Sequence, residues 1–337
     1  MERLPLGKLP IDILEKTVVK MTGAPSDRIL TGPEVGVDFG VVRLDKGYMV
    51  VSSDPITGVV SRIGWYAVNV NANDVATSGN RPQFMESIIL LPEGSTGHDV
   101  ALVARHIHAS ARSLGMSVVG GHTEITPGLR RPIVVVTAFS FVKDFVTSAG
   151  AKAGDTIMMT KSAGLEGTSV IASESRRLGF PLERSLAAKA TKLEGQLSVV
   201  PDAVHAYGTG VVHAMHDCTE GGVLGAVYEM SLASGLGFEI TEAEIPVAAE
   251  TRRISEVFRI DPIRLIGSGS LLLAVAGGGE ENVRRALRRV CEVTEIGHFR
   301  RGERTLAKRD GSELQLQKAP VDELWRTLGR LGRPNLG

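Results

Sequence analysis

The sequence Gly120-Gly121-His122-Thr123-Glu124 directly follows the apolar run Met116-Ser117-Val118-Val119. Glycine carries no Cβ, so two glycines at the predicted end of a strand let a backbone or a ligand approach closely. The three residues after them carry hydrogen-bonding side chains, and two of these can bind a metal ion. Taken alone, the segment is also typical of an ordinary turn.

Three other segments combine acidic or amide side chains with a predicted strand end or helix start. They are Ser53-Asp54-Pro55, Asn71-Ala72-Asn73-Asp74 and Asp217-Cys218-Thr219-Glu220-Gly221-Gly222. Together with Gly120–Glu124 they predict one site that is assembled from the ends of strands and the beginnings of helices.

The composition indicates a globular protein with two domains. The chain has 337 residues, of which 43% are hydrophobic, and this is enough for well-formed cores. Lys plus Arg and Asp plus Glu both number 38, so no bulk charge attracts nucleic acid or an anionic membrane. An aromatic content of 4% also argues against a stacking platform for single-stranded nucleic acid.

The two cysteines, Cys218 and Cys291, lie far apart and form no Cys-x-x-Cys pair, which argues against a disulfide framework or a thiolate zinc site. No apolar run is long enough to span a membrane. The start Met1-Glu2-Arg3-Leu4-Pro5 has no signal-peptide hydrophobic region. We therefore expect a cytoplasmic protein without membrane partners.

Hydrophobic periodicity predicts a mixed α/β (α+β) fold rather than a strict βαβ alternation. The main predicted strands cover 40–44, 48–52, 84–91, 132–142, 156–160 and 270–276, and the main predicted helices cover 11–21, 60–78, 100–114, 168–178, 219–234 and 321–331. The segment from Ser148 to Asp155 is rich in small residues and glycine, so we place the domain boundary there. The predicted domains are 1–148 and 149–337.

Each polar segment has a structural and a functional interpretation. Asp54 precedes a proline, which is typical of a turn. The amides and acid from Asn69 to Asp74 either cap a helix end or supply oxygen ligands for Mg²⁺. Asp217 and Thr219 either cap the following helix or, with the nearby glycines, form an anion site at its positive end.

Other common site types are disfavoured. The glycine-rich loop at 32–38 lacks the Gly-Lys-Ser/Thr of a phosphate-binding P-loop, and no complete dinucleotide-binding glycine motif is present. The histidines His205, His213 and His216 match no zinc-binding spacing. Cys218 is more typical of a small buried residue than of a nucleophile, because the sequence positions no base beside it.

With these motifs in order, the chain resembles the aminoimidazole ribonucleotide synthetase-like, or PurM-like, superfamily, and within it the branch of the hydrogenase maturation protein HypE. The resemblance covers nearly the whole chain. Its most specific parts are Asn73-Asp74 followed by Gly79-Asn80-Arg81-Pro82, and Gly120-Gly121-His122-Thr123. It also includes the Gly32–Asp38 loop, Thr160-Lys161, Glu166-Gly167-Thr168 and Asp217–Gly222.

The resemblance implies an N-terminal sheet-and-helix domain that forms a homodimer through its sheet, and a C-terminal α+β domain. ATP and Mg²⁺ would bind in the cleft between the two domains. It implies Asp38, Asp54, Asp74 and Glu124 as metal ligands and Asp54, Asp74, His122 and Asp217 as catalytic residues. It implies a nucleotide-binding role for Gly36, Asp38, Asn73, Gly120, Gly121, Thr123, Lys161 and Gly221.

Two features depart from the family pattern. The double glycine is followed by His122 where the family usually has an acid, so either His122 replaces that ligand or Glu124 supplies the charge. The sequence ends Leu331-Gly332-Arg333-Pro334-Asn335-Leu336-Gly337, without the terminal cysteine on which HypE carries out its chemistry. The resemblance therefore implies a HypE-like enzyme rather than a competent HypE.

The leading functional hypothesis is an ATP-dependent enzyme that phosphorylates or activates an unidentified small or protein-borne acceptor, in cofactor or hydrogenase maturation. A thiamine-monophosphate kinase-like or aminoimidazole ribonucleotide synthetase-like enzyme is the second hypothesis. The third is a nucleotide-binding scaffold that binds a maturation partner and has lost catalysis, so enzymatic activity itself stays open.

Overall fold

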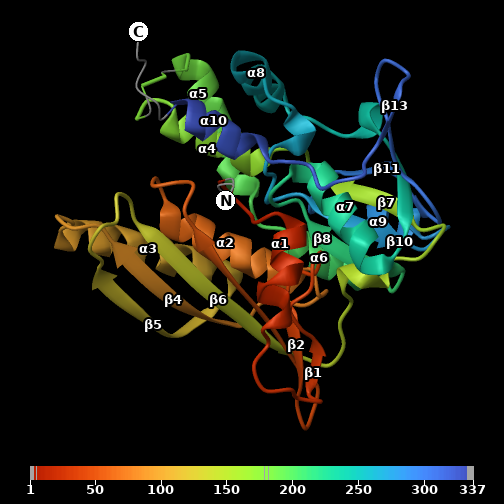
Figure 1. Cartoon of the computed structure of the whole chain (residues 1–337), viewed down its shortest axis with the longest axis horizontal. Coiled ribbons are helices and arrows are strands. Elements are labelled where there is room, and N and C mark those ends of the chain that lie inside the picture. Colours follow the sequence, from red (N-terminus) through yellow and green to blue (C-terminus); the bar gives the residue numbers. More distant parts are fainter. Residues whose placement is uncertain (1–3, 5, 178, 181, 332–337) are drawn as a thin grey trace.

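The computed structural model describes residue 4 and residues 6–177, 179–180 and 182–331. The terminal sequence Gly332–Gly337, in which the family's cysteine is missing, lies outside the described residues. Each half of the chain builds one β-sheet that is covered by helices (Figure 1). The two sheets agree with the predicted mixed α/β fold.

The first half forms a six-stranded sheet in the order β1-β2-β3-β6-β4-β5. Only β4 and β5 pair in parallel; the other neighbours are antiparallel. The strands are β1 (Ile29–Thr31), β2 (Gly40–Arg43), β3 (Tyr48–Ile56), β4 (Phe84–Leu91), β5 (Ser117–Ile125) and β6 (Ile133–Val142), and the helices are α1 (Ile11–Lys16), α2 (Ile63–Ala76) and α3 (Gly97–Leu114).

Helices α2 and α3 cover one face of this sheet (Figure 1). Residues of β6 alternate between this buried face and the opposite one, as expected for a sheet that is packed on one side. Helix α2 is buried almost all round, because the second half of the chain packs against its other side. This position brings its polar residues to the junction between the halves.

The second half forms a seven-stranded sheet in the order β13-β12-β9-β11-β7-β10-β8, in which only β12 and β9 pair in parallel. Its strands are β7 (Thr156–Thr160), β8 (Val212–Asp217), β9 (Gly237–Thr241), β10 (Leu271–Val275), β11 (Val293–Arg300), β12 (Arg304–Ala307) and β13 (Glu313–Gln315). Its helices are α4 (Leu165–Glu174), α5 (Arg184–Thr191), α6 (Val200–Tyr207), α7 (Gly222–Ser234), α8 (Ala249–Phe258), α9 (Glu280–Leu287) and α10 (Glu323–Leu331).

Strands β7 and β10 are buried on both faces, which explains their unbroken apolar sequences. The largest hydrophobic core runs from the first sheet through α2 into the second half, so the two halves share buried surface. The predicted boundary at residue 148 falls between the last strand of one sheet and the first strand of the other, but the limits of the domains stay a prediction. Within the described residues, no helix combines the length and apolar character needed to cross a bilayer.

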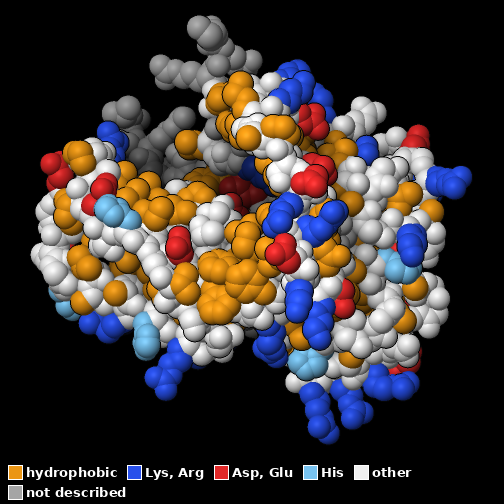
Figure 2. Space-filling view, turned by 90° about the horizontal axis from the view of Figure 1, so that it is seen from below, with side chains coloured by type: hydrophobic (Ala, Val, Ile, Leu, Met, Phe, Trp, Pro, Cys, Tyr) orange, Lys and Arg blue, Asp and Glu red, His pale blue; other side chains and the backbone are white. Residues whose placement is uncertain are grey.

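The face of the first sheet that α2 and α3 leave open carries many apolar side chains. Phe84, Phe139 and Phe141 form a cluster of aromatic rings on it, and Ile88 is 41% exposed. Figure 2, which views the molecule from below, shows hydrophobic side chains gathered over the half that contains this sheet. An apolar patch of this kind is typical of a surface that another protein covers.

Two local expectations are wrong. Asp54 does not lie in a turn, because β3 continues through it and pairs Asp54 with Val136 of β6. Gly120 and Gly121 do not end a strand but lie in the middle of β5, where a Cβ on Gly121 would collide with the backbone of Ser87 in β4. The two segments are therefore ordinary parts of the sheet rather than its loops.

Candidate functional site

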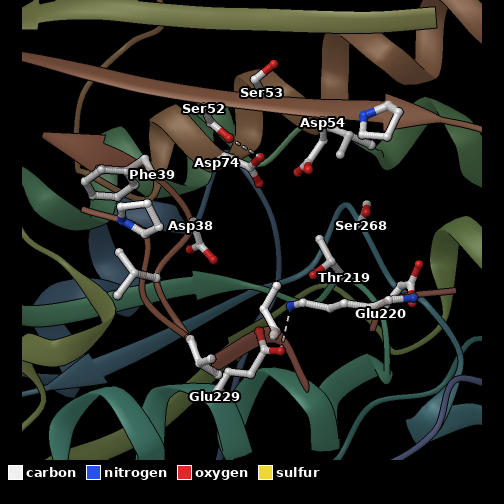
Figure 3. Close-up of a pocket in the computed structure, with 18 of the residues that line it drawn as sticks. Asp38, Phe39, Ser52, Ser53, Asp54, Asp74, Thr219, Glu220, Glu229 and Ser268 are labelled. Atoms are coloured by element: carbon white, nitrogen blue, oxygen red, sulfur yellow. Dashed lines mark hydrogen bonds and ion pairs between the residues drawn. The ribbon is translucent and has the colours of Figure 1, made fainter. Parts of the chain in front are cut away.

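A cleft of about 1190 Å³ lies between the two halves of the chain. One wall comes from the glycine-rich loop at 32–39, β3 and α2, and the other comes from the turns that precede α7 and β10. Figure 3 shows Asp38, Asp54 and Asp74 on the first wall, with Thr219, Glu220, Glu229 and Ser268 across the cavity. The fold thus brings polar residues from distant parts of the sequence together.

Asp74 and Asp54 occupy the first wall in different ways. Asp74 belongs to α2, is only 3% exposed and accepts a hydrogen bond from Ser52 Oγ at 2.7 Å. The backbone of Asp54 is held by Asn71, whose Oδ1 accepts from Asp54 N at 2.6 Å and whose Nδ2 donates to Asp54 O at 3.1 Å. Asn71 therefore fixes the strand while the Asp54 side chain faces the cavity (Figure 3).

Asp217 ends β8 and faces Asp38 from the second half of the chain. It is fully buried, and neither of its carboxylate oxygens has a hydrogen-bond partner among the described residues. Asp38, His216 and Asp217 each offer one ligand atom, and these atoms all lie within 4.8 Å of one another. Buried polar groups are normally satisfied, so unpartnered carboxylate oxygens need a physical explanation.

The protonation of these carboxyl groups reflects burial and mutual repulsion. Burial raises the pKa of Asp38 to about 6, with His216 opposing this shift. Burial also raises the pKa of Asp74 and Asp217, and the neighbouring carboxylates raise both further. Each group is therefore harder to ionise than an exposed aspartate. A cation bound among them would remove this penalty.

The donor set fits a hard divalent cation. Mg²⁺ is bound in proteins through one or two carboxylates together with water and substrate phosphates. Asp38 and Asp74 line the cleft, and the buried carboxylate of Asp217 lies next to Asp38. Within the described residues, both oxygens of Asp217 and Oδ2 of Asp38 have no hydrogen-bond partner. These residues, with Asp54, are the ones that would hold the metal.

A buried ion-pair network lies beside the aspartates. His216 Nε2 is 3.1 Å from Asp38 Oδ1 and 3.2 Å from Glu229 Oε2. Burial opposes the charged imidazolium, but Asp38 and Glu229 outweigh it and raise the pKa of His216 to about 9. Lys8 Nζ donates to Glu229 Oε1 at 2.6 Å, so the N-terminal segment also reaches the cleft.

The glycine-rich loop contacts this network through Gly36. This residue has a φ of +81°, and a Cβ on it would collide with the backbone oxygen of Glu229 in α7. Glycine is thus required both by the backbone conformation and by the close approach. Gly36 lines the cleft, and it allows the loop to place Asp38 next to His216.

The structure does not bring the segment Gly120–Glu124 into the cleft of its own chain. The segment lies on the exposed edge strand β5, and none of its residues lines the cavity. His122 and Glu124 pair with Ile88 and Leu90 and so lie on the open face, whereas Ser52 lies on the face that the helices cover. The interpretation of Gly120, Gly121, His122, Thr123 and Glu124 as a wall of that cleft is therefore wrong within one chain.

Three further predicted binding residues have structural partners instead. The amide of Asn73 donates to Leu197 O at 2.7 Å and accepts from Val199 N at 2.8 Å, so it ties α2 to the second half. It does not shape the cavity. The amides expected to cap a helix end are thus buried within α2.

Lys161 was assigned to the nucleotide, but its ammonium group donates to Ser198 O and Gly269 O and lies 2.7 Å from Asp202 Oδ2. Gly221 N donates to Asp322 Oδ2 at 2.7 Å and is not free to bind a phosphate. Neither residue lines the cleft. Helix α7 begins at Gly222 without a side-chain cap, so Asp217 and Thr219 do not cap it.

The sequence interpretation misses Lys8, Ser52 and Glu229, which line the cleft. It includes Glu166, Thr219 and Glu220 only as members of longer motifs. Glu229 carries a usable signal, because it is the only charged residue in the apolar helix Gly222–Ser234. Lys8 carries none, since a lone lysine near an N-terminus is typical of a solvated surface. Cys218 is buried as expected, and burial raises the pKa of its thiol.

Comparison with known proteins identifies the family. Residues 36–142 match the family model of the N-terminal domain of AIR synthase related proteins, and residues 152–307 match the model of their C-terminal domain. A hydrogenase expression/formation protein of Methanocaldococcus jannaschii is 25% identical over 291 residues, which is 84% of each chain. The carbamoyl dehydratase HypE of Rhizobium leguminosarum bv. viciae is 27% identical over 275 residues, covering 78% of this chain and 77% of HypE.

Solved structures show the same fold. The HypE–HypF complex contains a chain with a TM-score of 0.74 and 20% identity, covering 91% of this chain and 99% of that chain. HypE in complex with ATP gives 0.71 at 20% identity, covering 94% and 93%. A ThiL protein complexed with AMPPCP and TMP gives 0.70 at 19% identity, covering 92% and 94%. With both domain models matched in order along most of its length, the chain belongs to the AIR synthase related family, whose PurM-like fold it shares with HypE and ThiL.

Proposed function

We propose that this protein is an ATP-dependent enzyme that binds Mg-ATP in the cleft and phosphorylates or activates an unidentified acceptor. The observation that carries the proposal is the set of buried carboxylates from both halves, among which Asp217 has no partner within the described residues. Such a set is unfavourable without a cation. Mg²⁺ bound to a triphosphate supplies that cation.

The chemistry of phosphoryl transfer explains why these residues suffice. The protein has to position the phosphates and neutralise charge, and it needs little covalent chemistry of its own. Asp38, Asp74 and Asp217 would hold the metal, which offsets the negative charge of the transferred group. Lys8 brings an ammonium group to the same place through its ion pair with Glu229, although its side chain is 47% exposed. The loop that contains Gly36 would cover the phosphates.

The relatives support a role in maturation. HypE relatives are described as carbamoyl dehydratases and hydrogenase expression/formation proteins, and one HypE structure contains HypF. We propose that this protein likewise acts in cofactor or hydrogenase maturation with a partner protein. The ATP complex of HypE supports ATP as the nucleotide.

We also propose a homodimer that uses the open face and the β5 edge of the first sheet. The exposed aromatic cluster Phe84–Phe139–Phe141 and the exposed strand β5 support this surface. In such a dimer, Gly120–Glu124 lies at the boundary between the copies, where it could reach the cleft of the second copy. Such a dimer would explain why Gly120–Glu124 matches the family pattern although it does not line the cleft of its own chain.

Calorimetric titration of AMPPCP into the full chain with Mg²⁺ tests the proposal. We expect binding that requires Mg²⁺ and that the Asp54→Asn and Asp74→Asn variants weaken strongly. Asp12→Asn is a suitable control, because Asp12 is an exposed residue outside the cleft. No binding by the parent chain, or equal binding by the cleft variants, would contradict the proposal. Binding without any ATP turnover would instead favour the scaffold hypothesis.

A further inference from the structure

The second wall of the cleft contains a buried carboxylate for which the metal proposal has no use. Glu166 lies in the first turn of α4, lines the cavity and is only 5% exposed. Its Oε2 atom is buried and has no hydrogen-bond partner in the described part of the chain. A carboxylate in this situation is costly to bury unless it takes up a proton or a ligand.

A buried hydroxyl group stands next to Glu166. Ser268 is fully buried, lines the same cavity and has no hydrogen-bond partner for its Oγ atom among the described residues. Gly167 N donates to Ile266 O at 2.9 Å, and this bond holds the start of α4 against the turn that contains Ser268. The structure therefore fixes a buried carboxylate and a buried hydroxyl group side by side at one corner of the cleft, and within the described residues neither Glu166 Oε2 nor Ser268 Oγ has a hydrogen-bond partner from any third residue.

This corner faces the aspartates from across the cavity. Figure 3 shows Ser268 and Thr219 opposite Asp54 and Asp74, with open space between them. The corner is therefore the opposite side of the cavity from the aspartates that would hold the phosphates. An acceptor has to bind opposite the phosphates, so the corner is placed where an acceptor is needed.

The charges around the corner restrict what it can bind. Burial raises the pKa of Glu166 to about 7, Ser268 partly offsets the shift, and Asp322 and Glu220 add to it. The cleft is lined by seven acidic residues, Glu34, Asp38, Asp54, Asp74, Glu166, Glu220 and Glu229, but by only two basic residues, Lys8 and Arg131. Lys8 is already paired with Glu229. A phosphate group on the acceptor would meet carboxylates here and no free ammonium group.

We propose that Glu166 and Ser268 form the acceptor subsite, which binds an uncharged or cationic group that donates a hydrogen bond, such as an amide, amine or alcohol, and rejects a phosphate monoester. The carboxylate of Glu166 accepts the hydrogen bond, and Ser268 Oγ supplies a second polar contact. The inference rests on the proposed function, since it needs a nucleotide on the opposite wall. It distinguishes this cleft from one that would receive a phosphorylated metabolite.

The test uses three small probes that share a chain of three carbons: propionamide, propylamine and propyl phosphate. Their binding to the full chain loaded with Mg²⁺ and AMPPCP is measured by saturation-transfer NMR. We expect the amide and the amine to bind and the phosphate not to bind. Glu166→Gln should weaken propylamine binding about tenfold, because the ammonium group then meets a neutral amide oxygen instead of a carboxylate. Ser268→Ala should weaken propionamide binding by a smaller factor.

Glu34→Gln is the matched control, because Glu34 also lines the cleft but belongs to the glycine-rich loop. Thermal unfolding of each variant shows whether it is folded. The inference is overturned if propyl phosphate binds as well as propionamide, if no probe binds, or if Glu166→Gln changes nothing. The titration of AMPPCP comes first; if it fails, the proposed function falls, and the same probes then test the subsite on the nucleotide-free protein.

Discussion

Asp74 and Glu124 are both carboxylates of the first half of the chain, and their surroundings differ completely. Asp74 is 3% exposed, and burial and the neighbouring aspartates raise its pKa. The side chain of Glu124 is 46% exposed, accepts a hydrogen bond from Thr126 at 2.6 Å and lies 3.1 Å from His122, and these contacts lower its pKa. Asp74 therefore has one hydrogen-bond donor and neighbouring carboxylates, whereas Glu124 has two hydrogen-bonding partners and contact with solvent.

The different surroundings of Asp74 and Glu124 show that the burial of like charges, rather than the sequence motif, marks a binding site in this fold. Asp74 follows two amide side chains and Glu124 follows two glycines and a histidine, and both segments carry the resemblance to the family. Only the cleft gathers like charges out of water, where they are unstable without a ligand. The exposed strand becomes part of a site only when a second molecule covers it, so each region makes a separate prediction.

The largest expected effect is that of Asp74→Asn. Removing this ligand should lower Mg-dependent ATP hydrolysis by about 100-fold or more, because charge neutralisation is a main part of catalysis in phosphoryl transfer. The same change removes the repulsion between Asp74 and the neighbouring carboxylates in the metal-free protein. Its melting temperature should therefore rise by roughly 2–4 °C for each kcal/mol of repulsion that is removed. Loss of activity together with a lower melting temperature would indicate a structural role instead.

A mixing experiment tests whether Gly120–Glu124 acts on the second copy. The double variant His122→Ala/Glu124→Ala should itself hydrolyse ATP about tenfold more slowly, because it removes a charged contact. This double variant is then co-expressed with Asp74→Asn under a different tag, so that half of the dimers contain one copy of each. In a mixed dimer, one of the two clefts has both an intact Asp74 and an intact Gly120–Glu124 strand from the other copy. About a quarter of the parental activity should therefore return. No recovery in purified mixed dimers would show that the strand does not serve the second copy.

Lys8→Met should raise the KM for ATP by about tenfold, because the carboxylate of Glu229 then loses its ammonium partner and adds negative charge to the cleft that receives the phosphates. Lys8→Arg should raise the KM for ATP less than Lys8→Met does, since it keeps the positive charge. Lys16→Met is the control, because Lys16 is an exposed residue in α1. Steady-state kinetics measure all three variants, and an unchanged KM for Lys8→Met would remove this residue from the site.

The smallest expected effect is a dependence on pH. The folded-state pKa of Asp38 is about 6, above its ordinary value of 3.8, so the ionised cleft destabilises the metal-free fold as the pH rises through 6. Mg²⁺ requires the ionised form, and its stabilisation of the fold should therefore grow from pH 5.5 to pH 8. Thermal unfolding with and without Mg²⁺ measures this difference. A difference that is constant with pH would exclude Asp38 as a ligand.

The fold was predictable where local pattern and final packing agree. The strands Phe84–Leu91 and Thr156–Thr160 have the predicted bounds, and the fold class is confirmed. The turn expected at Asp54 is wrong because the residue before a proline favours an extended backbone, which also suits a strand, and pairing with β6 continues β3 through Asp54. Asn71 and Asn73 lie within a helix because tertiary hydrogen bonds satisfy their amides.

The candidate site was only partly predictable for a similar reason. Asp38, Asp54, Asp74 and Asp217 follow from the resemblance. The structure places the first three around one cavity and Asp217 beside Asp38. Glu166 and Ser268 become notable only through burial without a partner, which depends on packing between α4 and a distant turn. Which face of the sheet the side chains of β5 occupy depends on the register of its pairing with β4. The sequence pattern alone does not reveal this register.

The most direct test of the central claim is a crystal structure of the full chain with Mn²⁺ in place of Mg²⁺ and with AMPPCP. Manganese gives an anomalous signal that locates each metal ion independently of the nucleotide. We predict anomalous peaks between the carboxylates of Asp38, Asp74 and Asp217, with the triphosphate extending toward Glu166. A nucleotide bound elsewhere, or a cleft whose aspartates ligate no metal while AMPPCP is bound, would contradict the account.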